Sequence, residues 1–68
     1  MKLIAYQALL SNPQNIALVR SAQAAIERAG GRVSIAPPTP LGMVLVILEL
    51  PEGFRPEQVC PGLPFYPM

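Results

Sequence analysis

The chain has no histidine, no aspartate and no tryptophan, and it has a single cysteine among 68 residues. Without histidine, the usual side chain for proton transfer near neutral pH is missing. The four glutamates fall in separate segments of the chain. One cysteine can form neither a disulfide within the chain nor a structural metal site. We therefore expect a protein that is not an enzyme and that has no catalytic residue, no cofactor and no metal site.

Charged residues are also scarce, at 13% of the chain, which is about half their usual share in a soluble domain. The net charge is +1, and the five basic residues form no run. A nucleic-acid-binding surface needs clustered basic side chains, so we expect no nucleic-acid partner. The apolar run at 43–50 is far shorter than the about 20 residues that span a membrane, so we expect no membrane partner either.

The first 30 residues indicate a strand followed by a helix. Residues 2–9 are nearly all apolar, which is typical of a central strand. Tyr6 and Gln7 interrupt this run, which argues against a signal peptide and favours a cytoplasmic protein. Asn12 is a good N-cap, and Pro13 then occupies the first helical position, where its missing N–H costs nothing. Apolar residues recur at helical spacing until Gly30, which we expect to end the helix in a left-handed conformation.

The remaining residues indicate two more strands and a proline-rich end. Residues 32–36 and 43–50 read as strands joined by a proline-rich loop, and 56–59 can form one helical turn. Residues 61–68 hold three prolines and can form only an extended segment, either a short edge strand or a free tail. We expect a single α+β domain at 1–60, followed by a proline-rich C-terminal extended segment at 61–68.

This order of elements predicts a small ferredoxin-like sandwich. It is a β-α-β-β arrangement with a vestigial second helix and an extended C-terminal segment. One right-handed crossover followed by a hairpin gives an antiparallel sheet with one helix on one face. The first and third strands should lie side by side in the middle of that sheet.

Side-chain alternation divides the apolar run at 43–50 between the two faces of the sheet. If Glu49 faces solvent, then Met43, Leu45 and Ile47 share its face. Val44, Val46, Leu48 and Leu50 then face the helix and form the core. If Lys2 marks the outward face of the first strand, Tyr6 joins the exposed group.

An apolar sheet face without a second helix to cover it indicates an interaction surface, because large exposed apolar patches are uncommon on monomers. We therefore expect a protein-interaction module that binds a protein partner or forms a homo-oligomer. A second interpretation stays open, in which Phe65 and Tyr66 fold back and cover Met43, Leu45 and Ile47. A small-molecule-sensing regulatory module is a further alternative.

Three segments carry a resemblance to a known family. They are 2–6, which is Lys-Leu-Ile-Ala-Tyr, 30–35 at the end of the expected helix, and 42–51 around the third strand. In this layout the chain resembles the propeptide-type inhibitors of subtilisin-like proteases. The resemblance implies that Met43, Leu45 and Ile47 pack on a protease, and that 65–68 lies along its active-site cleft. The second helix of that family is reduced here to 56–59.

Overall fold

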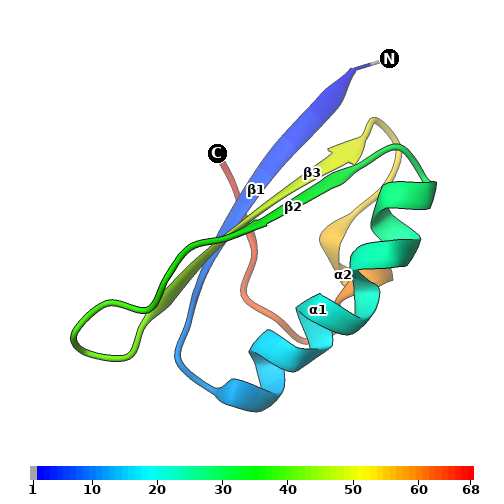
Figure 1. Cartoon of the computed structure of the whole chain (residues 1–68). Coiled ribbons are helices and arrows are strands. Elements are labelled where there is room, and N and C mark those ends of the chain that lie inside the picture. The colour runs from blue at the N-terminus through cyan, green and yellow to red at the C-terminus, as the bar shows by residue number, and fades with distance from the viewer. Residues whose placement is uncertain (1) are drawn as a thin grey trace.

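Residues 2–68 are described by the computed structural model, which contains one main helix, one short helix and a sheet. The elements follow in the chain as β1 (Leu3–Leu10), α1 (Pro13–Arg28), β2 (Arg32–Ile35), β3 (Val44–Pro51), α2 (Pro56–Val59) and β4 (Tyr66–Pro67). Both helices lie on the same side of the sheet, and the loop between β2 and β3 extends away from the rest of the molecule (Figure 1). The chain is therefore a small α+β protein in which a layer of helix packs on a layer of strands.

The four strands form one open antiparallel sheet in the order β2-β3-β1-β4. β1 and β3 pair along their whole length, from Leu3 opposite Pro51 to Leu10 opposite Val44. β2 pairs with the other side of β3. The prediction that the first and third strands lie side by side in the middle of an antiparallel sheet is confirmed.

The main helix begins and ends as the sequence indicates. The Asn12 side chain accepts a hydrogen bond from the Gln14 N–H at 2.8 Å, which satisfies one of the free donors of the first turn. At the other end, the Gly31 N–H bonds to the Ile26 carbonyl and the Gly30 N–H bonds to the Glu27 carbonyl. This pair of bonds is a Schellman motif, and Gly30 adopts the left-handed conformation that the motif requires, with φ of 95°.

The core lies between α1 and the face of the sheet that carries the even-numbered residues of β1 and β3. The buried hydrophobic side chains are Ala8, Leu10, Val19, Ile26, Val44, Val46, Leu48, Leu50 and Cys60. The prediction that alternate residues of the third strand form the core is therefore confirmed. Val33 and Ile35 of β2 pack against these buried side chains and extend the core toward the β2 edge of the sheet.

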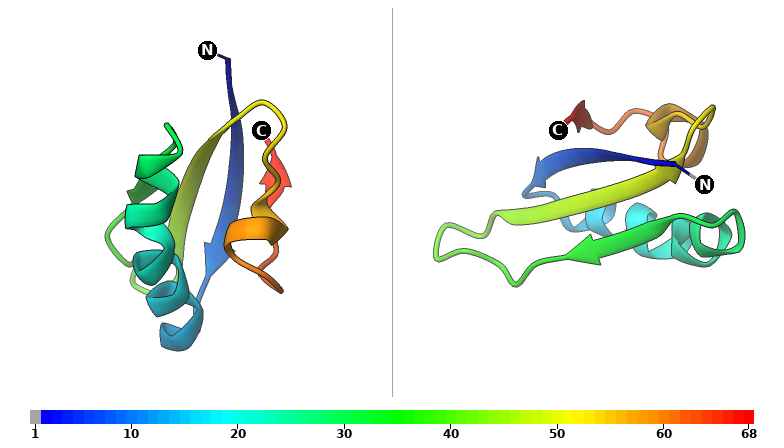
Figure 2. Two further views of the ribbon diagram at one scale, coloured as in Figure 1. Left: turned by 90° about the vertical axis from the view of Figure 1, so that its right-hand side faces the viewer. Right: turned by 90° about the horizontal axis from the view of Figure 1, so that it is seen from above.

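The segment after β3 covers the part of the core that α1 leaves free. α2 lies beside α1 in front of the sheet (Figure 2, left), and its first residue, Pro56, is buried. Leu63 and Phe65 also pack on the core. The chain then joins the sheet as β4, which pairs with β1 at Tyr6 and Gln7. Of the two forms considered for the last residues, the structure has the edge strand.

Candidate functional site

One face of the sheet is covered by neither helix, and we call it the open face. Residues that pair across neighbouring strands share a face, so the register identifies its members. They are Leu3, Ala5, Gln7 and Leu9 from β1, Leu45, Ile47 and Glu49 from β3, Arg32 and Ser34 from β2, and Tyr66 from β4. Met43, just before β3, continues the same alternation. Figure 2 (right) looks onto this face, with α1 behind the strands.

The middle of the open face is hydrophobic and in contact with solvent. Leu9 and Leu45 lie opposite each other and keep 54% and 38% of their surface exposed. Tyr66, on the neighbouring strand, is 65% exposed. These three side chains help to line a shallow pocket of about 310 Å³. Met43 and Ile47 are half-buried.

Charge on the open face is confined to one end of it. Arg32 of β2 lies directly opposite Glu49 of β3. Their opposite charges balance each other, so this end of the face has no net charge. The apolar middle, around Leu9 and Leu45, therefore carries no charge that would repel an apolar partner surface.

The prediction that Tyr6 lies on the open face is wrong. Tyr6 is opposite Leu48, which is buried on the helix side of the sheet, so Tyr6 faces the core as well. Lys2 is a poor marker of the outward face because it lies before β1 begins, and a charged side chain there can be exposed whichever way it faces. Gln7, an exposed polar residue within the strand, indicates the facing correctly.

Phe65 is also separated from the open face. Phe65 is half-buried and packs against the buried core side chains on the helix side of the sheet. Tyr66, the next residue, has the opposite facing and lies on the open face opposite Gln7. The tail therefore does not fold over Leu45 and Ile47. The tail contributes Tyr66 at one border of the open face, and alternation places Met68 on the same face.

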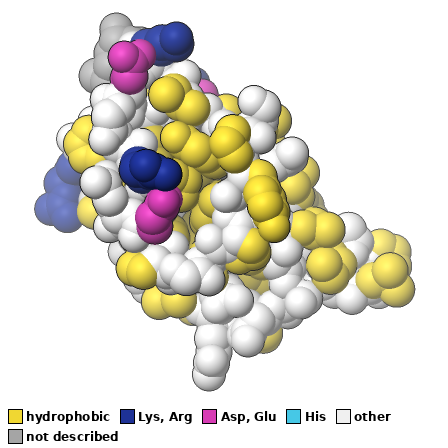
Figure 3. Space-filling view, turned by 180° about the vertical axis from the view of Figure 1, so that it is seen from behind, with side chains coloured by type: hydrophobic (Ala, Val, Ile, Leu, Met, Phe, Trp, Pro, Cys, Tyr) yellow, Lys and Arg dark blue, Asp and Glu magenta, His cyan; other side chains and the backbone are white. Residues whose placement is uncertain are grey.

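A larger pocket, of about 460 Å³, lies on the helix side of the sheet near the first residues of β1, and we call it the β1 pocket. Its lining residues are Ile4, Tyr6, Gly53, Phe54, Arg55, Pro56, Glu57, Phe65 and Pro67. Seen from this side, hydrophobic side chains surround a hollow beside one basic and one acidic side chain (Figure 3). Arg55 and Glu57 form an exposed ion pair with a distance of 3.3 Å between Nε and Oε1.

The sequence identifies the β3 residues of the open face but indicates neither Leu9 nor the β1 pocket. Leu9 is a main exposed residue of the open face, but a nearly continuous apolar run predicts burial on both sides. The β1 pocket depends on how Phe54 and Phe65, which are far apart in the sequence, come together near Ile4. The alternation of Gln7 and Leu9 could have identified the facing of β1, whereas no local pattern indicates the pocket.

Cys60 is buried, and burial raises the pKa of its thiol because the thiolate would lose its solvation. The folded protein therefore holds this proton more tightly than the unfolded chain does. The stability that follows is complete below the ordinary thiol pKa of about 8.5 and is lost as the pH rises above it.

We predict that replacing Cys60 by alanine makes stability less dependent on alkaline pH. Urea denaturation of both proteins at about pH 7 and about pH 10 measures the difference. Wild type should lose more unfolding free energy between the two pH values than Cys60→Ala loses. Equal losses would contradict a role of the buried thiol.

Two further observations concern residues 2–68. This part of the chain contains no group of three or more histidine, cysteine, aspartate or glutamate side chains placed to hold a metal ion. It also contains no helix with the length and hydrophobicity needed to cross a membrane. A comparison of the chain with known protein families, curated proteins and solved structures found no match.

Proposed function

We propose that this protein is an interaction module that binds another protein surface, either a partner or a second copy, on the open face of its sheet. The observation that carries the proposal is the exposed apolar middle of that face, formed by Leu9, Leu45 and Tyr66. Exposed apolar patches on small soluble domains mark contact surfaces more often than the rest of the surface does. An aromatic residue at the border is also typical of such surfaces.

Size indicates how strong such a contact can be. β1 and β3 have eight residues each, β2 has four and β4 has two. At about 3.3 Å per residue and about 4.8 Å between strands, these strands cover about 350 Å². Two such surfaces bury about 700 Å², which corresponds to a weak or transient contact.

A charge placed on the open face should weaken binding there without unfolding the protein. We predict that Leu45→Lys reduces binding of a hydrophobic-surface dye and reduces any self-association at least about threefold. Leu18, which is 50% exposed on α1, is the matched control, and Leu18→Lys should change neither property. Dye fluorescence and sedimentation velocity over a range of concentrations make both measurements.

Two results would count against this function. If the wild-type protein binds no dye and stays monomeric at every concentration, the open face does not behave as an apolar contact surface. If Leu18→Lys has the same effect as Leu45→Lys, the association depends on the net charge of the protein and not on the open face. Circular dichroism of each variant verifies that it is folded.

The order of elements, β-α-β-β-α-β, is that of the ferredoxin-like motif, and we propose that the fold is of this kind, with α2 as a reduced second helix. Inhibition of a subtilisin-like protease is the less favoured proposal. That role needs a tail free to enter a cleft, whereas Phe65 packs on the core and β4 pairs with β1.

A further inference from the structure

The loop between β2 and β3, residues 36–43, carries an exposed hydrophobic tip. It projects beyond the end of the sheet (Figure 1), and hydrophobic side chains lie at the end of this projection (Figure 3). None of its eight residues is charged. Leu41 is 89% exposed, the highest value among the large hydrophobic side chains of residues 2–68. The loop therefore holds an apolar side chain in solvent, away from the core.

The β2–β3 loop is held in one shape by three hydrogen bonds at Thr39. The Thr39 carbonyl accepts from the Gly42 N–H at 2.8 Å, which closes a tight turn with Leu41 inside it. The Thr39 N–H donates to the Met43 carbonyl at 2.8 Å, and the Thr39 hydroxyl oxygen accepts from the Met43 N–H at 3.1 Å. Three of the eight loop residues are prolines, whose φ angles are fixed. A contact made by Leu41 therefore costs little loss of loop freedom.

A receptor for such a side chain lies on the open face. The shallow pocket of about 310 Å³, which we call the open-face pocket, is lined by Gln7, Ala8, Leu9, Leu45 and Tyr66. None of these residues is charged, and they lie toward the end of the sheet from which the β2–β3 loop projects. Arg32 and Glu49, the charged pair of the open face, lie toward the opposite end. The part of the open face nearest the loop is therefore apolar, as the loop is.

We propose that the open face binds a second copy of this chain, and that Leu41 of each copy enters the open-face pocket of the other. This inference rests on the proposed function, and it adds the identity of the partner and the residue that anchors it. Burial of an exposed leucine side chain favours association. Loop tip and pocket are both uncharged, so no charge is stripped of water when they meet.

Two-fold symmetry allows both contacts to form at once. Leu45 follows Leu41 by four residues, so their Cα atoms are at most about 14 Å apart. An axis that passes close to Met43, between these two residues, brings Leu41 of each copy to the pocket of the other. The open face alone is small for a specific interface, and the two loops add buried surface to it. This addition favours the arrangement over a contact between the open faces alone.

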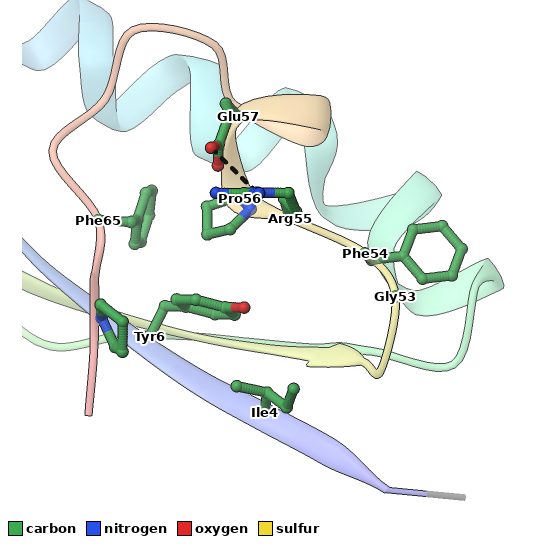
Figure 4. Close-up of a pocket in the computed structure, with 9 residues that line it drawn as sticks. Ile4, Tyr6, Gly53, Phe54, Arg55, Pro56, Glu57 and Phe65 are labelled. Atoms are coloured by element: carbon green, nitrogen blue, oxygen red, sulfur yellow. Dashed lines mark ion pairs between the residues drawn. The ribbon is translucent and has the colours of Figure 1, made fainter.

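The β1 pocket is a poorer receptor for Leu41. The ion pair of Arg55 and Glu57 lies at its border, across from the Tyr6 ring (Figure 4). An apolar side chain that enters there displaces water from two charged groups, which opposes binding. The β1 pocket also lies on the helix side of the sheet, so its use would leave the apolar middle of the open face in solvent.

Sedimentation equilibrium at up to about 1 mM protein tests this inference. Wild type should self-associate, and Leu41→Ser should raise the dissociation constant at least about tenfold, because each of the two contacts loses a buried leucine side chain. Leu45→Lys alters the pocket and should weaken association to a similar extent. Leu18, which is 50% exposed on α1, provides the matched control, and Leu18→Ser should associate as wild type does. Circular dichroism verifies that each variant is folded.

Two defective variants should regain part of the association when they are mixed. The Leu41→Ser protein keeps its open-face pocket, and the Leu45→Lys protein keeps its loop tip. Unlabelled Leu45→Lys added to isotope-labelled Leu41→Ser should therefore shift the NMR signals of Leu9 and Tyr66. Unlabelled protein that carries both substitutions is the control, and its shifts should be at least about threefold smaller.

Failure of this inference is distinguishable from failure of the proposed function. The inference is overturned if wild type is monomeric up to about 1 mM, or if Leu41→Ser associates as wild type does. It is also overturned if the mixed variants give no larger shifts than the control with both substitutions. In each of these cases the proposed function stands if Leu45→Lys reduces dye binding. If Leu45→Lys changes neither dye binding nor association, the proposed function fails as well.

Discussion

Replacing Gly31 by alanine is expected to reduce the free energy of unfolding by about 3 kcal/mol. Gly31 is buried where the end of α1 approaches β3. A Cβ atom there would lie 2.5 Å from the Glu49 carbonyl oxygen and 2.8 Å from Cγ2 of Ile26. Glu49 O is a backbone atom of the central strand, so it cannot move aside alone. The helix end must shift and loosen the packing of Ile26 against Leu48.

Gly42→Ala is the matched control, and it separates crowding from backbone strain. Gly42 has a φ of 82°, and a Cβ there would meet nothing within 4 Å. Alanine at this position should cost about 1 to 2 kcal/mol, because an L-residue is strained in the left-handed region. Gly31 is not one of the glycines with a positive φ, so the loss of stability in Gly31→Ala comes from contact of the new Cβ with neighbouring atoms.

Urea denaturation followed by circular dichroism gives both values. A domain of this size is expected to have a total stability of only about 3 to 10 kcal/mol, at about 0.05 to 0.15 kcal/mol per residue. Gly31→Ala should therefore lose at least about a third of its unfolding free energy, whereas Gly42→Ala should lose less and unfold at a higher urea concentration. If Gly42→Ala is the less stable of the two, this result would contradict the close contact between the end of α1 and β3 at Gly31.

Local patterns predict the elements of this fold well, because the signals at their ends are strong. Asn12 and Pro13 begin α1 and Gly30 ends it, each through a backbone requirement that few other residues meet. The split of β3 between two faces also follows from the sequence, since Glu49 is its one charged residue. These inferences depend on neighbours within a few residues.

The facing of β1 and the path of the tail could not be predicted in the same way. Gln7 is a single local signal for the facing of β1, and the other residues depend on the pairing of β1 with β3, which is a contact between distant segments. Phe65 and Tyr66 are adjacent aromatic residues with the same local context, yet one packs on the core and the other is exposed. Their facing follows from the register of β4 against β1 and not from their own composition.

The facing of β3 itself can be measured with two substitutions on the same strand. Leu48 is fully buried and packs with Ile26 and Leu50, whereas Leu45 is 38% exposed on the open face. Leu48→Ala should reduce the free energy of unfolding by about 3 to 4 kcal/mol, because it removes buried methyl groups and leaves a cavity. Leu45→Ala should cost less than about 1 kcal/mol in the monomer.

The same pair of variants connects stability with the proposed function. A second copy or partner bound at Leu45 would stabilise the folded state in proportion to its concentration. The melting temperature of wild type should then rise with protein concentration, and Leu45→Ala should reduce that rise. Leu48→Ala should lower the melting temperature by a similar amount at every concentration. A concentration-dependent rise that is equal in wild type and Leu45→Ala would place the contact away from the open face.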